Sequence, residues 1–309
     1  MKVAVIGAGA VGTAIAAKIV ERNLADVVLV DVVPGLAEGK ALDILHASPI
    51  LGFTRTIRGT TELEACLWSE LVVVACGRTR QPGMTREELL EQNAATIREV
   101  AATLRAYAPG ATVLVVTNPL DVMTWLVAEV TGFPRKRVLG MAGVLDAARL
   151  RYLLGQELGV APKDVSTLVL GSHGEQMLPL LGYTFVGGVP VKEKISQAQW
   201  DELVRKTREA GADIVRLLQK GSASYAPAVS VVEMVEAILL DQKRILVASV
   251  WCDGPYGIRG AYLGLPVLLG REGIEAIQEL SLSQEELLCL QRTAKEIEGL
   301  FAKVASLRA

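Results

Sequence analysis

The sequence of 309 residues is poor in the residue types that build metal and disulfide sites. It contains only two histidines and four cysteines, and the cysteines are widely separated: Cys66, Cys76, Cys252 and Cys289. No pair of them has the spacing of a metal-binding motif. The first residues also lack the charged and apolar regions of a secretory signal. We therefore expect reduced, buried thiols, no bound metal and a cytoplasmic protein.

The sequence also lacks long apolar runs and an excess of charge. Its apolar runs, such as 27–30, are too short to span a bilayer. Lys and Arg number 32 against 34 Asp and Glu, which gives a formal net charge of −2. We therefore expect neither nucleic acid nor a membrane as a partner. Because 51% of the residues are hydrophobic, the chain can bury the core of one large domain or two ordinary ones.

Strand-like and helix-like segments alternate through the first half of the chain. Buried strands are predicted at 2–6, 27–31, 54–58, 71–76, 112–116 and 136–140. Helices are predicted at 10–22, 35–47, 86–107 and 119–130. This alternation favours βαβ units and a parallel sheet.

The second half has a different pattern of predicted helices and strands. Helices are predicted at 145–158, 197–220, 226–240 and 283–307, with strand-like segments at 166–170, 244–251 and 266–269 and short antiparallel strands between 171 and 188. We therefore expect an α/β protein. Residues 1–142 would form an N-terminal Rossmann domain with a doubly wound parallel sheet. Residues 143–309 would form an α+β catalytic domain with antiparallel strands and long helices.

A dinucleotide-binding fingerprint follows the first predicted strand. Residues 7–12 read GAGAVG and open the first helix, so Gly7, Gly9 and Gly12 have the spacing of GxGxxG. Such glycines allow backbone N–H groups to approach a pyrophosphate at the helix N-terminus. Asp31 ends the second strand, 19 residues after Gly12 (31 − 12). A carboxylate there accepts hydrogen bonds from the ribose and repels a 2′-phosphate, which favours NAD over NADP.

The segment 77–86, GRTRQPGMTR, joins a buried strand to a helix. Loops at the carboxyl ends of parallel strands are where α/β proteins bind ligands. Three arginines and a Pro-Gly pair are typical of a mobile lid that attracts anions. The sequence therefore predicts a small substrate with more than one carboxylate.

Three further segments carry polar residues that could react. Asn118 ends a strand in TNPLD, where a cap before Pro119 is an equally good explanation. Asp146 and Arg149 are three residues apart at a helix start, where they could simply be an acidic residue of the first turn and a solvated arginine. His173 lies in a glycine-rich loop, SHG, that a substrate could approach closely. Taken singly, none of these segments decides a function.

Taken together and in this order, the motifs GAGAVG, the arginine loop, TNPLD, LDAAR and SHG resemble the lactate/malate dehydrogenase family over essentially the whole chain. The overall style is similar to the lactate-dehydrogenase-like malate dehydrogenases of bacteria. The resemblance implies that His173 exchanges a proton with the substrate and is paired with Asp146. It also implies the remaining site residues: Arg149 for the shared carboxylate, Arg86 for the reacting carbonyl, Asn118 for the carbonyl and nicotinamide, and Gly7, Gly9, Gly12, Asp31, Asn93 and Asn118 for NAD.

The resemblance further implies which 2-hydroxy acid reacts. The residue six positions before Arg86 faces the variable end of the substrate, and Arg80 there would meet a second carboxylate. Ala223, where lactate enzymes usually have threonine, would leave room for it. We therefore expect reversible oxidation of (S)-malate to oxaloacetate. A shift of one residue in the alignment would place Gln81 there and favour lactate, and Arg78 is a rival for the same role.

Other functions remain open from the sequence. They are an L-lactate dehydrogenase, a metal-dependent NAD glycosidase, for which we see no ligand cluster, and a non-catalytic NAD-binding protein. The resemblance also implies a homotetramer, with a dimer as the alternative.

Overall fold

The computed structural model describes residues 1–78 and 84–306. Six strands of the first half form a parallel sheet: β1 (Lys2–Ile6), β2 (Asp26–Val30), β3 (Ile57–Thr60), β4 (Leu71–Val74), β5 (Thr112–Val115) and β6 (Val138–Met141). They lie in the order β3-β2-β1-β4-β5-β6, and every neighbouring pair is parallel. This is the doubly wound order of a Rossmann sheet, so the predicted fold class is confirmed.

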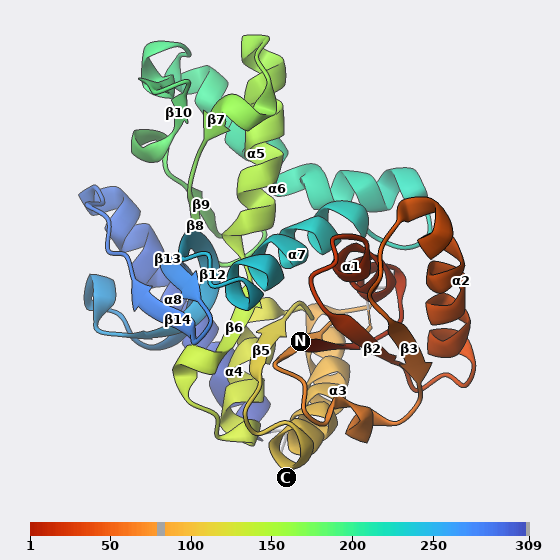
Figure 1. Ribbon diagram of the computed structural model, residues 1–309. Helices are drawn as coiled ribbons and strands as arrows, with labels where there is room; N and C mark the ends of the chain where they lie inside the picture. Colours follow the sequence, from red (N-terminus) through yellow and green to blue (C-terminus); the bar gives the residue numbers. More distant parts are fainter. Residues whose placement is uncertain (79–83, 307–309) are drawn as a thin grey trace.

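Helices cover both faces of this sheet. In the first half they are α1 (Ala10–Glu21), α2 (Leu36–Leu51), α3 (Arg86–Tyr107) and α4 (Leu120–Thr131); in the second half they are α5 (Gly143–Leu158), α6 (Gln197–Leu218), α7 (Tyr225–Leu239) and α8 (Gln284–Ser306). α1 packs against α7, whereas α3 packs against α4, which also contacts α8 (Figure 1). Short 3-10 turns occur at Leu63–Cys66, Arg135–Arg137, Pro162–Asp164, Leu181–Tyr183, Val191–Glu193 and Pro255–Gly257.

The strands of the second half are antiparallel. They are β7 (Val165–Ser166), β8 (Val169–Gly171), β9 (Met177–Pro179), β10 (Phe185–Val186), β11 (Val189–Pro190), β12 (Arg244–Asp253), β13 (Arg259–Gly270) and β14 (Gly273–Ile277). β12, β13, β8 and β9 follow one another in a sheet, β14 pairs with β13, and β7, β10 and β11 form a separate small sheet.

The two halves share one sheet. β6 pairs with β12 in antiparallel fashion, through the pairs Met141–Ala248 and Gly140–Ser249. Over the described residues the combined sheet has eleven strands. The sheet therefore crosses the predicted division at residue 142, and that division stays a prediction.

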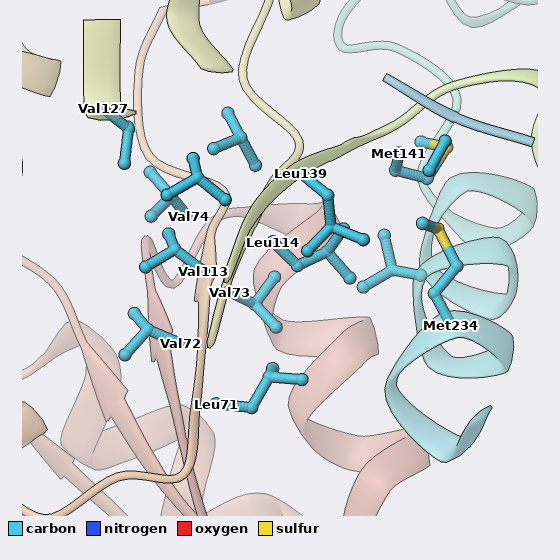
Figure 2. Packing of buried hydrophobic residues seen from close by; sticks show 14 of the residues in the cluster. Leu71, Val72, Val73, Val74, Val113, Leu114, Val127, Leu139, Met141 and Met234 are labelled. Carbon is cyan, nitrogen blue, oxygen red and sulfur yellow. The ribbon is translucent and has the colours of Figure 1, made fainter. Parts of the chain in front are cut away.

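The core lies between the central strands and their helices. Each of β4, β5 and β6 is buried along its whole length, as expected for parallel strands covered on both faces. Figure 2 shows Val73, Leu114 and Leu139 packed together, with Met141 of β6 and Met234 of α7 at one side of the cluster. These rigid strands end at the edge where the polar motifs lie.

Most boundaries agree with the predictions, and the exceptions have local causes. α3 spans the predicted range, and it begins at Arg86 because the Thr85 hydroxyl accepts a hydrogen bond from the Glu88 N–H, and Glu88 accepts one from Thr85. α2 runs through Pro49, beyond the predicted end at 47. β13 is much longer than the predicted 266–269. The prediction was too short because glycines interrupt the apolar pattern of this segment. One of them, Gly264, allows the Gly171 carbonyl to approach to 2.4 Å from where a Cβ would stand.

No helix in the described part of the chain is both long and apolar enough to cross a membrane.

Candidate active site

The glycine-rich loop brings three backbone segments into close contact. A Cβ added at Gly7, which has φ +105°, would lie 2.7 Å from the Cys76 nitrogen, and one at Gly12 would lie 1.8 Å from the Gly7 carbonyl oxygen. At Gly9 a Cβ would meet nothing within 4 Å. The loop is thus tightly packed beneath Gly7 and Gly12 but open above Gly9, at the N-terminus of α1. Such a cradle is suited to the pyrophosphate of a dinucleotide.

Asp31 holds this loop from the end of β2. Its Oδ2 accepts a hydrogen bond of 2.7 Å from the Ala8 N–H, and its Oδ1 accepts one of 3.0 Å from the Val33 N–H. The carboxylate therefore lies beside the glycine loop, where the fingerprint places it. Its predicted bond to the ribose remains a proposal.

Asn93 connects two loops at the edge of the sheet. It is fully buried, its Oδ1 accepts from the Arg78 N–H at 2.7 Å, and its Nδ2 donates to the carbonyls of Arg78 and Asn118 at 3.1 and 2.7 Å. Backbone groups thus use both ends of its amide. The cofactor contact expected of Asn93 therefore becomes, in our proposal, an indirect one that sets the positions of Gly77 and Asn118.

Two adjoining cavities bring the predicted residues together. One of about 300 Å³ is lined by Val11 of the glycine-loop helix and by Ala223, and the other, of about 850 Å³, is lined by the middle of α6 and the C-terminal half of α8. Asn118, Arg149 and His173 line both cavities. Residues distant in sequence therefore surround one space that continues toward the glycine loop.

His173 is paired with Asp146 on the wall of this space. Its Nδ1 lies 2.9 Å from Asp146 Oδ2, and the Asp146 side chain is only 2% exposed. Burial alone would lower the pKa of His173, but the charge of Asp146 and the hydrogen bond to it outweigh burial and raise the pKa. With Nδ1 engaged, Nε2 is the ring nitrogen left for a substrate proton.

Arg149 lies one helical turn after Asp146 on α5. Its Nη1 is 3.4 Å from Asp146 Oδ1, and its side chain is 12% exposed. Burial lowers the pKa of the guanidinium, and Asp146 opposes this, but an arginine stays charged in a protein. A half-satisfied cation on the cavity wall is suited to grip a carboxylate through two parallel hydrogen bonds.

Part of the arginine loop, residues 79–83, lies outside what the structure describes. Arg80 and Gln81 lie outside the described residues. Arg86 is the first residue of α3, and its side chain is likewise outside what is described. The roles expected of Arg80 and Arg86 therefore rest on the sequence.

The sequence reasoning missed a buried acidic residue next to the site. Asp121, in α4, accepts hydrogen bonds of 2.6 Å from the hydroxyls of Ser172 and Ser249. Its position in the TNPLD motif was visible in the sequence, but nothing there indicated that an acidic residue in a helix would be buried. Among residues 1–78 and 84–306, no group of three or more His, Cys, Asp or Glu side chains could hold a metal ion.

Comparison with known proteins agrees with this geometry. Residues 1–140 match the lactate/malate dehydrogenase NAD binding domain, and residues 143–307 match the alpha/beta C-terminal domain of the same enzymes. The chain is 48% identical to a malate dehydrogenase of Synechocystis sp. over 296 residues, which cover 96% of this chain and 91% of the relative.

Two solved structures are similar to this one. The malate dehydrogenase of Picrophilus torridus in its apo form has a TM-score of 0.96 at 35% identity, covering 99% of this chain and 98% of that one. The lactate dehydrogenase of Cryptosporidium parvum, complexed with lactic acid and NAD, has a TM-score of 0.94 at 39% identity, covering 98% of each chain. The predicted cofactor, NAD, is confirmed by the matched NAD binding domain. The chain therefore belongs to the lactate/malate dehydrogenase family, whose members are NAD-dependent oxidoreductases of 2-hydroxy acids.

Proposed function

We propose that this enzyme is a malate dehydrogenase, which interconverts (S)-malate and oxaloacetate. The observation that carries the chemistry is the His173–Asp146 pair, 2.9 Å apart, on a cavity wall that also presents Arg149. In malate oxidation, His173 Nε2 takes the hydroxyl proton, while Asp146 stabilises the imidazolium and fixes its tautomer. Arg149 holds the carboxylate beside the reacting carbon. NAD, when bound, accepts the hydride.

The preference for a dicarboxylic substrate is the finer part of the proposal. Relatives named malate dehydrogenase are 42–48% identical to the chain, although a solved lactate dehydrogenase is also similar. Ala223 lines the cavity shared by Asn118 and His173, and its small side chain would leave room for a larger substrate. Arg80 would pair with the second carboxylate. Pyruvate would leave that arginine unpaired in a closed site, and such discrimination can reach roughly 10⁴-fold.

The test compares NADH oxidation with oxaloacetate and with pyruvate, for the wild type and for Arg80→Gln. We expect a strong oxaloacetate preference that Arg80→Gln abolishes or reverses. A wild-type preference for pyruvate would instead establish a lactate dehydrogenase with Gln81 facing the substrate. Arg78→Gln is the matched control, because it removes the rival arginine. If Arg78→Gln changed the preference for oxaloacetate over pyruvate and Arg80→Gln did not, Arg78 would be the residue that selects the substrate.

We also propose that the chain forms a homotetramer in the cytoplasm. Large apolar side chains are exposed on α2, where Ile50 is 87% exposed, and near the end of α6, where Leu217 is 77% exposed. Such side chains gathered on one element are typical of subunit contacts. The four cysteines are free thiols, which suits a reducing compartment. Light scattering of the purified protein decides between a tetramer and a dimer.

A further inference from the structure

We propose that Asp121 is a positioning residue of this reaction: its carboxylate holds the His173 loop through Ser172 and adds a second negative charge to the surroundings of the imidazole. The proposal rests on the function proposed above for His173. It concerns a residue that is almost fully buried in the cavity wall and has no part in the roles already described.

The contacts of Asp121 are short and complete. Oδ2 accepts from the Ser172 hydroxyl and Oδ1 from the Ser249 hydroxyl, each at 2.6 Å. Hydrogen bonds to a carboxylate at this distance are the strong, charge-assisted kind. Both serines belong to segments far from Asp121 in sequence, so the carboxylate joins α4, the His173 loop and β12.

The close approach of Ser249 has an identifiable cause. Ser249 pairs with Gly140 of β6. A Cβ at Gly140 would lie 3.0 Å from the Ser249 Cβ and 2.6 Å from the Thr124 hydroxyl oxygen. Only a residue without a side chain allows α4, β6 and β12 to converge this closely around the carboxylate.

The backbone of the His173 loop turns at two glycines. It leaves β8 at Gly171 (φ +83°) and passes Gly174 (φ +102°), and both positions have a positive φ that glycine adopts readily. Between them, two consecutive side chains are tied to two acidic groups: Ser172 to Asp121 on α4, and His173 to Asp146 on α5. The imidazole is therefore oriented from both helices at once.

The charges point the same way. The charges of Asp146 and Asp121 favour the protonated form of His173, and the charge of Arg149 opposes it. The other charged side chains that line the cavity are Glu87 of α3, Glu175 of the loop, Arg208 of α6, and Glu296 and Lys303 of α8. Burial raises the pKa of Asp121 to about 6, and the bonds from Ser172 and Ser249 oppose the rise. At neutral pH Asp121 is thus largely ionised, and its charge is available to His173.

The first experiment replaces Asp121 with asparagine, which keeps the shape and removes the charge. His173 is titrated by NMR in histidine-labelled protein, where the exposed His46, the second of the chain's two histidines, serves as the internal control. We expect the pKa of His173 to fall in Asp121→Asn while that of His46 is unchanged. An unchanged His173 pKa would overturn the proposal. This readout needs no turnover, so it decides the inference even if the proposed substrate is wrong.

The pH profiles give a second readout that a merely structural role would not produce. Oxaloacetate reduction needs protonated His173, and malate oxidation needs neutral His173. In Asp121→Asn we expect the midpoints of both profiles to move to lower pH. Equal losses in both directions with unmoved midpoints would mean general damage and would contradict the proposal.

A pair of serine variants covers the case in which Asp121→Asn fails to fold. Ser172→Ala and Ser249→Ala each remove one 2.6 Å hydrogen bond from the same carboxylate, but only Ser172 adjoins His173. We expect similar falls in Tm, with kcat/KM at least fivefold lower in Ser172→Ala than in Ser249→Ala, since small misplacements of a catalytic group cost rate steeply. Equal losses of kcat/KM would remove the positioning role.

Discussion

The glycine loop allows one substitution, Gly to Ala, to separate packing from cofactor binding. At Gly12 the added Cβ would lie 1.8 Å from the Gly7 carbonyl oxygen, whereas real Cβ atoms essentially never come closer than 3.0 Å. The start of α1 must therefore move by about 1.2 Å (3.0 − 1.8) away from β1. At Gly9 the same methyl group meets nothing within 4 Å.

The expected magnitudes differ accordingly. Overpacking of this kind costs about 3 kcal/mol, so in a chain of 309 residues Gly12→Ala should lower Tm by roughly 5 °C. Gly9→Ala should leave Tm almost unchanged without cofactor, because the backbone there is extended and accepts a side chain. Its methyl group would instead occupy the space we assign to the pyrophosphate. We expect NADH to bind at least about tenfold more weakly, a loss of about 1.4 kcal/mol.

Thermal unfolding with and without NADH measures both effects. At a concentration 100 times the wild-type Kd, NADH stabilises the folded state by about 2.7 kcal/mol, and a tenfold weaker Kd leaves about 1.4 kcal/mol. NADH fluorescence titration gives the Kd directly. Wild-type NADH affinity in Gly9→Ala would show that the open space above Gly9 is not the cofactor site. An unchanged Tm in Gly12→Ala would refute the packing argument.

Two further predictions concern single carboxylates. Asp31→Ser should narrow the preference for NADH over NADPH, because it removes the charge that repels a 2′-phosphate; equal discrimination in kcat/KM would exclude Asp31 from that role. Asp146 raises the pKa of His173, so oxaloacetate reduction should persist above the ordinary histidine pKa and fall only as pH passes the raised value. In Asp146→Asn the pKa of His173 should be lower, because burial is no longer opposed by the Asp146 charge. The rate of oxaloacetate reduction should then begin to fall at lower pH. An unmoved profile would mean that another group limits the rate.

The sequence predicted the elements well where local signals and periodicity agree. Thr85 and Glu88 form the capping box that begins α3, and the buried runs of β4 and β5 follow from their apolar composition. β13 was predicted only in part, because Gly260 and Gly264 look like breaks. Gly264 is needed where the Gly171 carbonyl approaches, and that contact is invisible before the chain folds.

In the candidate site, too, local sequence patterns predicted some features, whereas others depend on tertiary packing. The spacing of Asp146 and Arg149 on one helix predicted that they share a face. The pairing of Asp146 with His173, 27 residues later, came only from family resemblance, because periodicity does not relate a helix to a distant loop. Asp121 was missed because its partners, Ser172 and Ser249, are brought to it by tertiary packing.

The pairing of β6 with β12 has a consequence for folding. Residues 1–142 alone would leave the hydrogen-bonding groups of Gly140 and Met141 without their partners Ser249 and Ala248, and uncovered strand edges of this kind promote aggregation. The helix α7, which packs on α1, would be missing as well. In a nascent chain this strand edge thus stays uncovered until β12 has been synthesised, more than a hundred residues later. The two halves should then unfold together in a single cooperative transition.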